Sequence, residues 1–355
     1  MIITRTPLRV SFFGGGTDLP AWYRDNGGAV IATSINQYVY IQMRRLPAIF
    51  DFQFRVAWSR IEQTHTPHDI QHPVVRMVLQ HYWTDPTKGL EIIYNADLPS
   101  RSGLGSSSAF TVALLHALHG TLGHMPSQQQ LAAESIFVEQ HLLKEPVGSQ
   151  DQITTAIGGL NRIDFQQDDT WRVTPLIMTK DRRNTLEQHM MLFFTGFVRS
   201  ASQIESSKVE NLKSKQRFFS RLQRIVDESQ AVFTSDPDMV HGLAQLLDEG
   251  WQLKRSLAHS VTNSIVDEAY ETALRAGALG GKLLGAGGGG FILFLVPPES
   301  QQNVRDALHA LTEVPIRMEN DGSRVLLFDP ELTSNYPTSF NRRAPAPVLL
   351  EGAAS

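Results

Sequence analysis

Residues 90–110 of this 355-residue chain read LEIIYNADLPSRSGLGSSSAF, and this stretch decides the fold. An apolar β-branched run ends at a proline, a glycine-serine loop follows, and small and apolar residues then recur at helical spacing. Because a helix N-terminus carries unsatisfied N–H groups and about half a positive elementary charge, this order favours an anion such as phosphate. Gly103 and Gly105 would let the backbone approach a ligand closely, although the Gly-Lys-Ser/Thr of the Walker pattern is absent. The alternative is an ordinary capped helix after a flexible turn.

Three further stretches favour the ligand-binding interpretation. Residues 7–20, PLRVSFFGGGTDLP, end a predicted strand in three glycines without the GxGxxG spacing of a dinucleotide fold. Residues 280–296, GGKLLGAGGGGFILFLV, predict two strands joined by a turn that holds more glycines than a hairpin needs. Residues 144–156, KEPVGSQDQITTA, predict a turn followed by a helix that begins at Asp151.

In order and separation, these motifs resemble those of the GHMP kinases, the superfamily of galactokinase, homoserine kinase, mevalonate kinase and phosphomevalonate kinase. PLRVSFFGGGTD is similar to the motif P-x-R/K-V/I-x-x-x-G, PSRSGLGSSSA to the loop P-x-x-x-G-L-G-S-S-A, and KLLGAGGGG to the C-terminal glycine motif. The resemblance extends from Ile2 to about residue 330. Within the superfamily, GGGTD, VGSQDQ, FFTGFVRSAS and GGKLLGAGGGGF are most similar to the D-glycero-D-manno-heptose 7-phosphate kinases.

The resemblance implies an α+β, two-domain GHMP kinase fold. Residues 1–185 would form a mixed β/α domain with a left-handed βαβ-type nucleotide site, and residues 186–335 a ferredoxin-like α/β domain. Residues 336–355 would be a proline-containing tail that can be mobile. The charged stretch 179–188, TKDRRNTLEQ, is predicted to be a loop near the boundary.

Hydrophobic periodicity places the main elements of the N-terminal half. It predicts strands over residues 8–13, 29–45 and 89–99, and helices over 72–83, 106–123 and 127–143, the last with Ser127 as its N-cap.

The resemblance implies that the glycine-serine loop wraps the triphosphate of ATP. The nucleotide-binding residues would be Pro99, Ser102, Gly103, Leu104, Gly105, Ser106, Ser107 and Ser108. Ser107 and Glu139 would hold Mg²⁺, a hard cation that prefers oxygen ligands. The spacing from Glu139 to Asp151 is one residue longer than that expected from mevalonate kinase, which leaves Glu134 on the same predicted helix as the alternative ligand.

The same resemblance assigns catalysis to Asp151 and Arg9. Asp151 would accept the proton of the anomeric hydroxyl, and Arg9, at the family's Lys/Arg position, would stabilise developing negative charge. The sugar-binding residues would be Gly15, Gly16, Thr17, Asp18, Gly148, Arg199, Gly287 and Gly288. Gly15 and Gly16 replace the Glu-His pair of galactokinase, so only Asp18 carries over from its sugar contacts.

A dianionic sugar phosphate in a chain of net charge −4 requires local cations. Arg199 in TGFVRSAS is the first candidate for the terminal phosphate, with a helix cap as the alternative. Lys254 and Arg255 are weaker candidates, because the solvated face of a helix is the better explanation for this pair.

Composition limits the other functions. The net charge of −4 gives no general attraction for nucleic acid or anionic lipid, and the absence of cysteine excludes thiolate chemistry and sulfur-ligated metals. No apolar run approaches the roughly 18 to 20 residues that span a bilayer, so a cytoplasmic protein without nucleic-acid or membrane partners is expected. Oligomeric state is not readable.

The expected function is that of a transferase that uses ATP and Mg²⁺. By resemblance it would phosphorylate the anomeric hydroxyl of D-glycero-D-manno-heptose 7-phosphate to the 1,7-bisphosphate, which feeds nucleotide-activated heptose synthesis. The alternatives are a kinase of another sugar phosphate, such as an octose 8-phosphate, and a non-catalytic sensor like those derived from galactokinase. Asp151, Arg9 and Ser107 are all present, which favours the enzyme; a decarboxylase acting on diphosphomevalonate matches the motifs less well.

Overall fold

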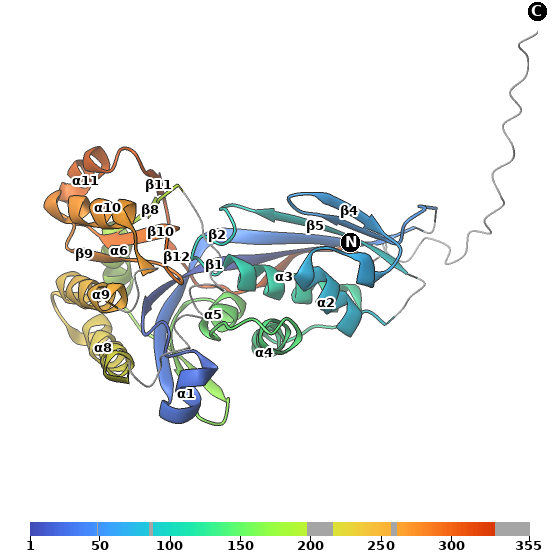
Figure 1. Ribbon diagram of the computed structural model, residues 1–355, viewed down its shortest axis with the longest axis horizontal. Helices are drawn as coiled ribbons and strands as arrows, with labels where there is room; N and C mark the ends of the chain where they lie inside the picture. Colours follow the sequence, from blue (N-terminus) through green and yellow to red (C-terminus); the bar gives the residue numbers. More distant parts are fainter. Residues whose placement is uncertain (48, 85–87, 197–215, 257–260, 331–355) are drawn as a thin grey trace, which may run out of the picture.

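The computed structural model describes residues 1–47, 49–84, 88–196, 216–256 and 261–330. A nine-stranded sheet and a four-stranded sheet form the two ends of an elongated molecule (Figure 1). The helices are α1 (Pro20–Asn26), α2 (Pro73–Tyr82), α3 (Ser106–Thr121), α4 (Gln128–Ile136), α5 (Gln150–Ile157), α6 (Lys180–His189), α8 (Gln216–Ser235), α9 (Met239–Arg255), α10 (Ser264–Arg275) and α11 (Gln301–Ala307). The strands are β1 (Ile2–Phe13), β2 (Gly28–Leu46), β3 (Phe54–Ala57), β4 (Ile61–Thr64), β5 (Gly89–Ala96), β6 (Leu160–Phe165), β7 (Trp171–Pro175), β8 (Met190–Phe194), β9 (Gly280–Leu283), β10 (Phe291–Leu295), β11 (Thr312–Val314), β12 (Met318–Glu319) and β13 (Arg324–Phe328).

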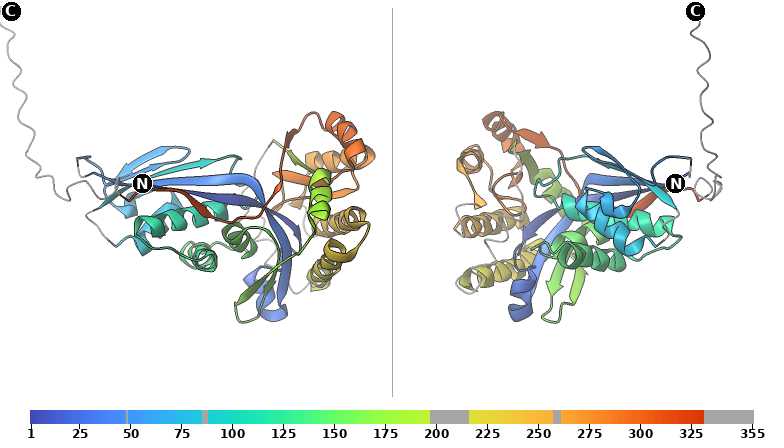
Figure 2. Two further views of the ribbon diagram at one scale, coloured as in Figure 1. Left: turned by 180° about the vertical axis from the view of Figure 1, so that it is seen from behind. Right: turned by 45° about the vertical axis from the view of Figure 1, so that its right-hand side comes forward.

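The large sheet is built around the long strands β1 and β2. Its order is β13-β1-β2-β5-β3-β4, with β6 and β12 also paired to β2, and β7 to β6. Helix α3 packs on β1 and β2 and is apolar almost all round, as expected for a helix buried between a sheet and other helices. Helices α2 to α5 cover this face of the sheet (Figures 1 and 2). The predicted strands and helices of the N-terminal half are confirmed, and the Ser127 hydroxyl caps α4 by accepting from the N–H of Gln130.

The small sheet is antiparallel, in the order β11-β8-β10-β9. As predicted, β9 and β10 are adjacent antiparallel strands joined by the glycine-rich turn. Their apolar side chains pack with Phe193, Trp251 and Tyr270 into a second core. The two sheets and their helices give the α+β, two-part architecture that the motifs predicted.

The stretch 179–188, predicted to be a loop, is helix α6. The Thr179 hydroxyl caps it by accepting from the N–H of Arg182, and Leu186 is its buried anchor. The Arg182 guanidinium donates to the carbonyl oxygens of Val232, Phe233 and Asp236 at the end of α8. These tertiary contacts stabilise a helix whose charged sequence shows no apolar stripe.

Residues 318–328 lie in the large sheet, although the predicted range 186–335 placed them in the second domain. Strand β12 pairs with β2, and β13 pairs with the first residues of β1, from Ile2 to Arg5. The chain therefore returns to the first sheet after completing the second one, a long-range pairing that local patterns do not encode. The predicted tail, residues 336–355, lies outside the described residues.

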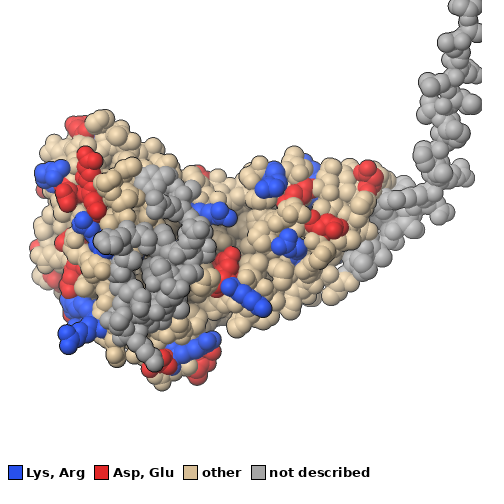
Figure 3. All heavy atoms as spheres, in the orientation of Figure 1, with Lys and Arg blue, Asp and Glu red and all other residues tan. Residues whose placement is uncertain are grey.

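Acidic and basic side chains are interspersed on the face shown in Figure 3, in keeping with the small net charge. Within the described ranges, no helix combines the length and apolar character that crossing a membrane requires.

Candidate active site

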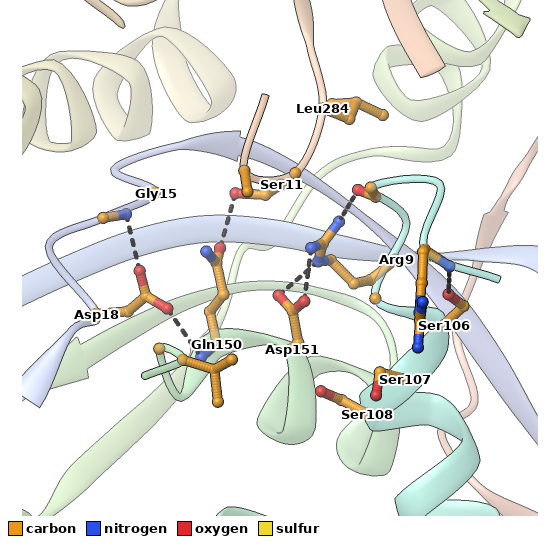
Figure 4. A pocket seen from close by; sticks show the side chains of 18 of the residues that line it. Arg9, Ser11, Gly15, Asp18, Ser106, Ser107, Ser108, Gln150, Asp151 and Leu284 are labelled. Atoms are coloured by element: carbon orange, nitrogen blue, oxygen red, sulfur yellow. Dashed lines mark hydrogen bonds and ion pairs between the residues drawn. The ribbon is translucent and has the colours of Figure 1, made fainter. Parts of the chain in front are cut away.

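A cleft of about 810 Å³ lies between the two parts of the molecule. It is lined by the end of β1, the loop before α3, the first turn of α5, the glycine turn between β9 and β10, and parts of α8 and α9. Figure 4 shows the side chains that converge at its centre.

Arg9 and Asp151 form a bidentate ion pair in this cleft. Arg9 Nε donates to Asp151 Oδ1 and Nη2 to Oδ2, both at 2.7 Å, while Nη1 donates to the carbonyl oxygen of Gly103 at 2.6 Å. Arg9 is 3% exposed, whereas the Asp151 side chain keeps 25% of its surface accessible. The arginine is thus fixed against the wall, and the carboxylate faces the cleft on the first turn of α5.

The glycine-serine loop presents the N-terminus of α3 to the same cleft. Gly105 is left-handed with φ +71°, and α3 begins at Ser106. Of the predicted nucleotide-binding residues, five line the cleft: Gly103, Gly105, Ser106, Ser107 and Ser108. Pro99, Ser102 and Leu104 are not among the lining residues. Ser102 donates to the Pro99 carbonyl, and the Leu104 carbonyl accepts from Arg9 N–H, so these three support the loop from behind.

The glycine turn packs against this loop through bare backbone. A Cβ on Gly285 would lie 2.4 Å from Gly103 Cα, and one on Gly290 would lie 2.3 Å from Ser102 O. This close approach explains the excess of glycines. Of the predicted sugar-binding pair in the turn, Gly287 lines the cleft, whereas Gly288, whose N–H donates to Val261 O, does not.

Glu139 lies in the cleft wall, on a π-helical turn (Phe137–Leu142) that continues α4. π turns often occur at functional sites. Ser108 Oγ and Gln152 Nε2 both donate to Glu139 Oε2, at 3.0 and 2.6 Å. Burial raises the pKa of Glu139 to about 8.

The alternative metal ligand, Glu134, lies elsewhere. Its carboxylate accepts from His119 Nε2 and Gln130 Nε2, and it is not among the residues that line the cleft. Ser107, the predicted partner of Glu139, is exposed and lines the cleft, but the serine in contact with Glu139 is Ser108.

Asp18 is buried at the opposite end from Glu139. Its Oδ1 accepts from Gly16 N–H at 2.8 Å and its Oδ2 from Gln150 N–H at 3.3 Å. Burial raises the pKa of this carboxyl group. A Cβ on Gly148 would lie 1.8 Å from Asp18 Oδ2, so glycine is required there for the carboxylate to fit.

The remaining predicted sugar-binding residues divide into three groups. Gly15 and Gly16 line the cleft with Asp18 and Gly148. Thr17 is buried, and its hydroxyl donates to the carbonyls of Gly14 and Ala29, so it stabilises the turn instead. Arg199 lies outside the described residues.

The interpretation of Lys254 as part of a solvated helix face is wrong. Lys254 lines the cleft, and its ammonium group donates to the carbonyl oxygens of Leu283 and Gly285. Arg255 does point away, into an ion pair with Asp267 at 3.0 Å. Successive residues of a helix lie about 100° apart, so the two neighbours face different surroundings.

Several residues that line the cleft could not be identified as site residues from a single sequence. Lys282 reaches the cleft and donates to Phe12 O, and Ser11 and Gln150 lie beside the Arg9–Asp151 pair. An aromatic group also lines the cleft, with neighbouring ring centroids 4.7 to 5.1 Å apart; its members are Trp58, His72, Phe110 and Tyr94. Only the position of Gln150, next to Asp151 in VGSQDQ, could have indicated its role.

The donor set at Glu139 fits a magnesium ion. Glu139 Oε1 is buried and accepts no hydrogen bond of ordinary geometry among the described residues, and serine hydroxyls lie beside it. Mg²⁺ typically takes one or two carboxylates together with substrate phosphates and water. No cluster of three or more His, Asp or Glu side chains suited to a metal ion occurs in the part of the chain that the structure describes.

Two family models match the chain in the order that the motifs predicted. Residues 70–159 match the GHMP kinases N terminal domain, and residues 236–313 match the GHMP kinases C terminal domain. This chain belongs to the GHMP kinase family. It is therefore an enzyme, and its co-substrate is ATP.

The kinase is similar to curated proteins over most of its length. It is 29% identical to the D-glycero-alpha-D-manno-heptose 7-phosphate kinase of Campylobacter jejuni, over 86% of this chain and 93% of that protein. It is 26% identical to the bifunctional fucokinase/GDP-fucose pyrophosphorylase of Arabidopsis thaliana, over 88% of this chain but only 32% of that longer protein.

Solved structures share the fold. A D-glycero-D-manno-heptose 1-phosphate kinase from Bacteroides thetaiotaomicron superposes with a TM-score of 0.75 at 24% identity, covering 93% of this chain and all of that one. Galactokinase from Lactococcus lactis, complexed with galactose, gives a TM-score of 0.69 at 17% identity, covering 91% and 94%.

Proposed function

We propose that this kinase transfers the γ-phosphoryl group of ATP to the anomeric hydroxyl of D-glycero-D-manno-heptose 7-phosphate. The product would be the 1,7-bisphosphate, a precursor for nucleotide-activated heptose. The Arg9–Asp151 pair carries the proposal, because it places a fixed carboxylate opposite the N-terminus of α3 within one cleft. The choice of sugar rests on the similarity to the Campylobacter jejuni enzyme.

The two ends of the cleft suit the two substrates. The aromatic wall of Trp58, His72 and Tyr94 would take the base of ATP, since planar rings stack favourably. Burial lowers the pKa of His72 to about 4, so its ring is neutral at pH 7. The N–H groups at the start of α3 would then bind the phosphates, and the Gly15, Gly16 and Asp18 end would take the sugar.

Asp151 would orient the anomeric hydroxyl and accept its proton. One carboxylate oxygen would receive the hydrogen bond from the hydroxyl as the nucleophilic oxygen approaches the γ-phosphorus in line. Arg9 keeps the carboxylate in place through two hydrogen bonds, so little reorganisation is needed during transfer. The bond to the β-phosphate oxygen breaks, and ADP leaves with that oxygen.

Glu139 would hold Mg²⁺ through its carboxylate, assisted by Ser107 or Ser108. When bound, the ion neutralises charge on the phosphates. Lys254 and Lys282 bring two more cationic side chains to the cleft, which supports binding of anionic substrates. Arg199 remains the prediction for the terminal phosphate of the sugar.

A coupled ADP-release screen with magnesium ATP tests the proposal. The panel includes heptose 7-phosphate, heptose 1-phosphate, an octose 8-phosphate, unphosphorylated heptose, fucose and galactose. We expect the highest kcat/KM with heptose 7-phosphate, and a product that resists reduction by borohydride because its anomeric carbon is blocked. A higher kcat/KM with an unphosphorylated sugar, or a product phosphorylated elsewhere, would refute it.

A further inference from the structure

Gln150 occupies the space between the two carboxylates of the sugar end. Its side chain stands between Asp18 and Asp151 in Figure 4 and lines the cleft. Its backbone N–H donates to Asp18 Oδ2, while the next residue, Asp151, pairs with Arg9. The backbone of Gln150 is therefore fixed on one side by Asp18 and on the other by the Arg9–Asp151 pair.

Ser11 orients the amide of this side chain. Ser11 Oγ donates to Gln150 Oε1 at 2.7 Å, and Ser11 is 5% exposed. Arg9 and Ser11 are two residues apart on β1 and point to the same face, so one strand fixes two neighbouring side chains of α5. Gln152, the third residue of this turn, bonds to Glu139 instead.

The orientation directs the amide donor into the sugar end. With Oε1 bonded to Ser11, the Nε2 group has two N–H donors, and no acceptor among the described residues is paired with it. A Cβ on Gly15 would lie 3.5 Å from Nε2, so the glycine loop lies beside the amide without covering it. The wall then presents, side by side, the carboxylate of Asp18, the amide donor of Gln150 and the carboxylate of Asp151.

We infer that Gln150 is a specificity-determining residue whose Nε2 donates to the sugar oxygen next to the anomeric hydroxyl. That oxygen is either the 2-hydroxyl or the ring oxygen, and both are acceptors. Ser11 is the positioning residue that keeps the donor pointing into the cleft. This inference rests on the proposed function, because it requires the anomeric hydroxyl to lie at Asp151.

Three variants test it in the full chain with the preferred sugar phosphate of the wild type. Q150M removes the donor at similar size and should lower kcat/KM for the sugar about tenfold, with the KM for ATP changed less than twofold. Q150E places a third carboxylate between Asp18 and Asp151 and should lower it further. S11A should give the same selective loss to a smaller degree, and the exposed Gln129, as Q129M, is the matched control.

A 2-deoxy substrate distinguishes the two oxygens. If the 2-hydroxyl accepts the bond, the wild-type kcat/KM for the 2-deoxy sugar should be about tenfold lower than for the parent sugar, and Q150M should not lower it further. If the ring oxygen accepts the bond, Q150M should lower kcat/KM equally for both sugars. Wild-type sugar kinetics in Q150M and Q150E would overturn the inference. So would equal increases in the KM for ATP and for the sugar in S11A. A wild-type enzyme inactive with every sugar would instead refute the proposed function.

Discussion

Asp151 is the residue on which the proposed chemistry depends most directly. Replacing it with Asn keeps the shape but removes the proton acceptor, so turnover should fall at least ~100-fold. Binding of ATP should be nearly unchanged, because the proposed role of the carboxylate is to contact the sugar and not the nucleotide. Turnover is measured by ADP release and ATP binding by calorimetry, with Asp169→Asn, an exposed partner of Arg24, as the control. Normal turnover in Asp151→Asn would exclude the proposed role.

Gly105 allows a second test, because the chain offers a matched glycine. Both Gly105 and Gly123 have positive φ at the ends of α3, +71° and +81°, so alanine costs about 1 to 2 kcal/mol of backbone strain at either. A Cβ at Gly105 would also lie 2.9 Å from Arg9 Cγ, whereas a Cβ at Gly123 would meet no atom of the described part of the chain within 4 Å. Gly105→Ala should therefore lower turnover at least tenfold and Gly123→Ala should not. Similar kinetics in the two variants would mean that the loop does not position Arg9.

The pairing of Arg9 with Asp151 could be predicted from sequence, but the residues around this pair could not. Arg9 and Asp151 stand in motifs with a recognisable spacing. Ser108 contacts Glu139 where Ser107 was expected, because the rotation of α3 around its axis is set by packing on β1 and β2. Gln150 stands next to Asp151 in VGSQDQ, but nothing in that pattern shows that its side chain bonds to Ser11 and lines the cleft.

The contact between α3 and the residue before β13 contains a half-buried histidine. His116 Nδ1 lies 2.8 Å from Ser323 Oγ, which in turn accepts from Thr6 Oγ1 on β1. Burial, aided by the nearby His119, lowers the pKa of His116 to about 4. A histidine whose pKa is lowered by folding makes its full contribution to stability above about pH 6.5, which is its pKa in the unfolded chain. This contribution is lost as the pH falls towards 4.

Acidification should therefore destabilise the protein through His116. Between pH 7 and 4, His116→Gln should lose less stability than wild type, by on the order of 2 kcal/mol. Urea unfolding at pH 7, 5.5 and 4 measures the difference, and the exposed His309→Gln is the control. An identical pH dependence in His116→Gln and wild type would contradict the assignment.

Among the elements, the sequence pattern predicted the β9–β10 hairpin but not helix α6. The difference is whether neighbouring residues in the chain encode the element. The hairpin is encoded locally, by two apolar runs and a glycine turn. Helix α6 has one buried apolar residue, and it depends on Arg182 reaching the end of α8, some 50 residues away along the chain. Periodicity cannot report a contact of that kind.

At the scale of the molecule, the two parts meet through backbone at Gly103 and Gly285. Gly285→Ala would place a Cβ 2.4 Å from Gly103 Cα, so the loop and the turn must separate. We expect a lower thermal midpoint and at least a fivefold increase in the KM for ATP. At Gly196, φ is +83° and a Cβ would meet no atom of the described residues within 4 Å, so Gly196→Ala should show only the cost of backbone strain. Equal effects of the two substitutions would mean that this contact does not shape the nucleotide site.

Pairing of β13 with β1 has a consequence for synthesis on the ribosome. Strand β1 is among the first segments made, yet its outer neighbour, residues 324–328, is among the last of those described. At about 5 to 20 residues per second, β1 waits roughly 15 to 60 seconds with that edge unpaired. An exposed edge strand readily pairs with other chains, so we expect the nascent protein to depend on chaperones until β13 has been made.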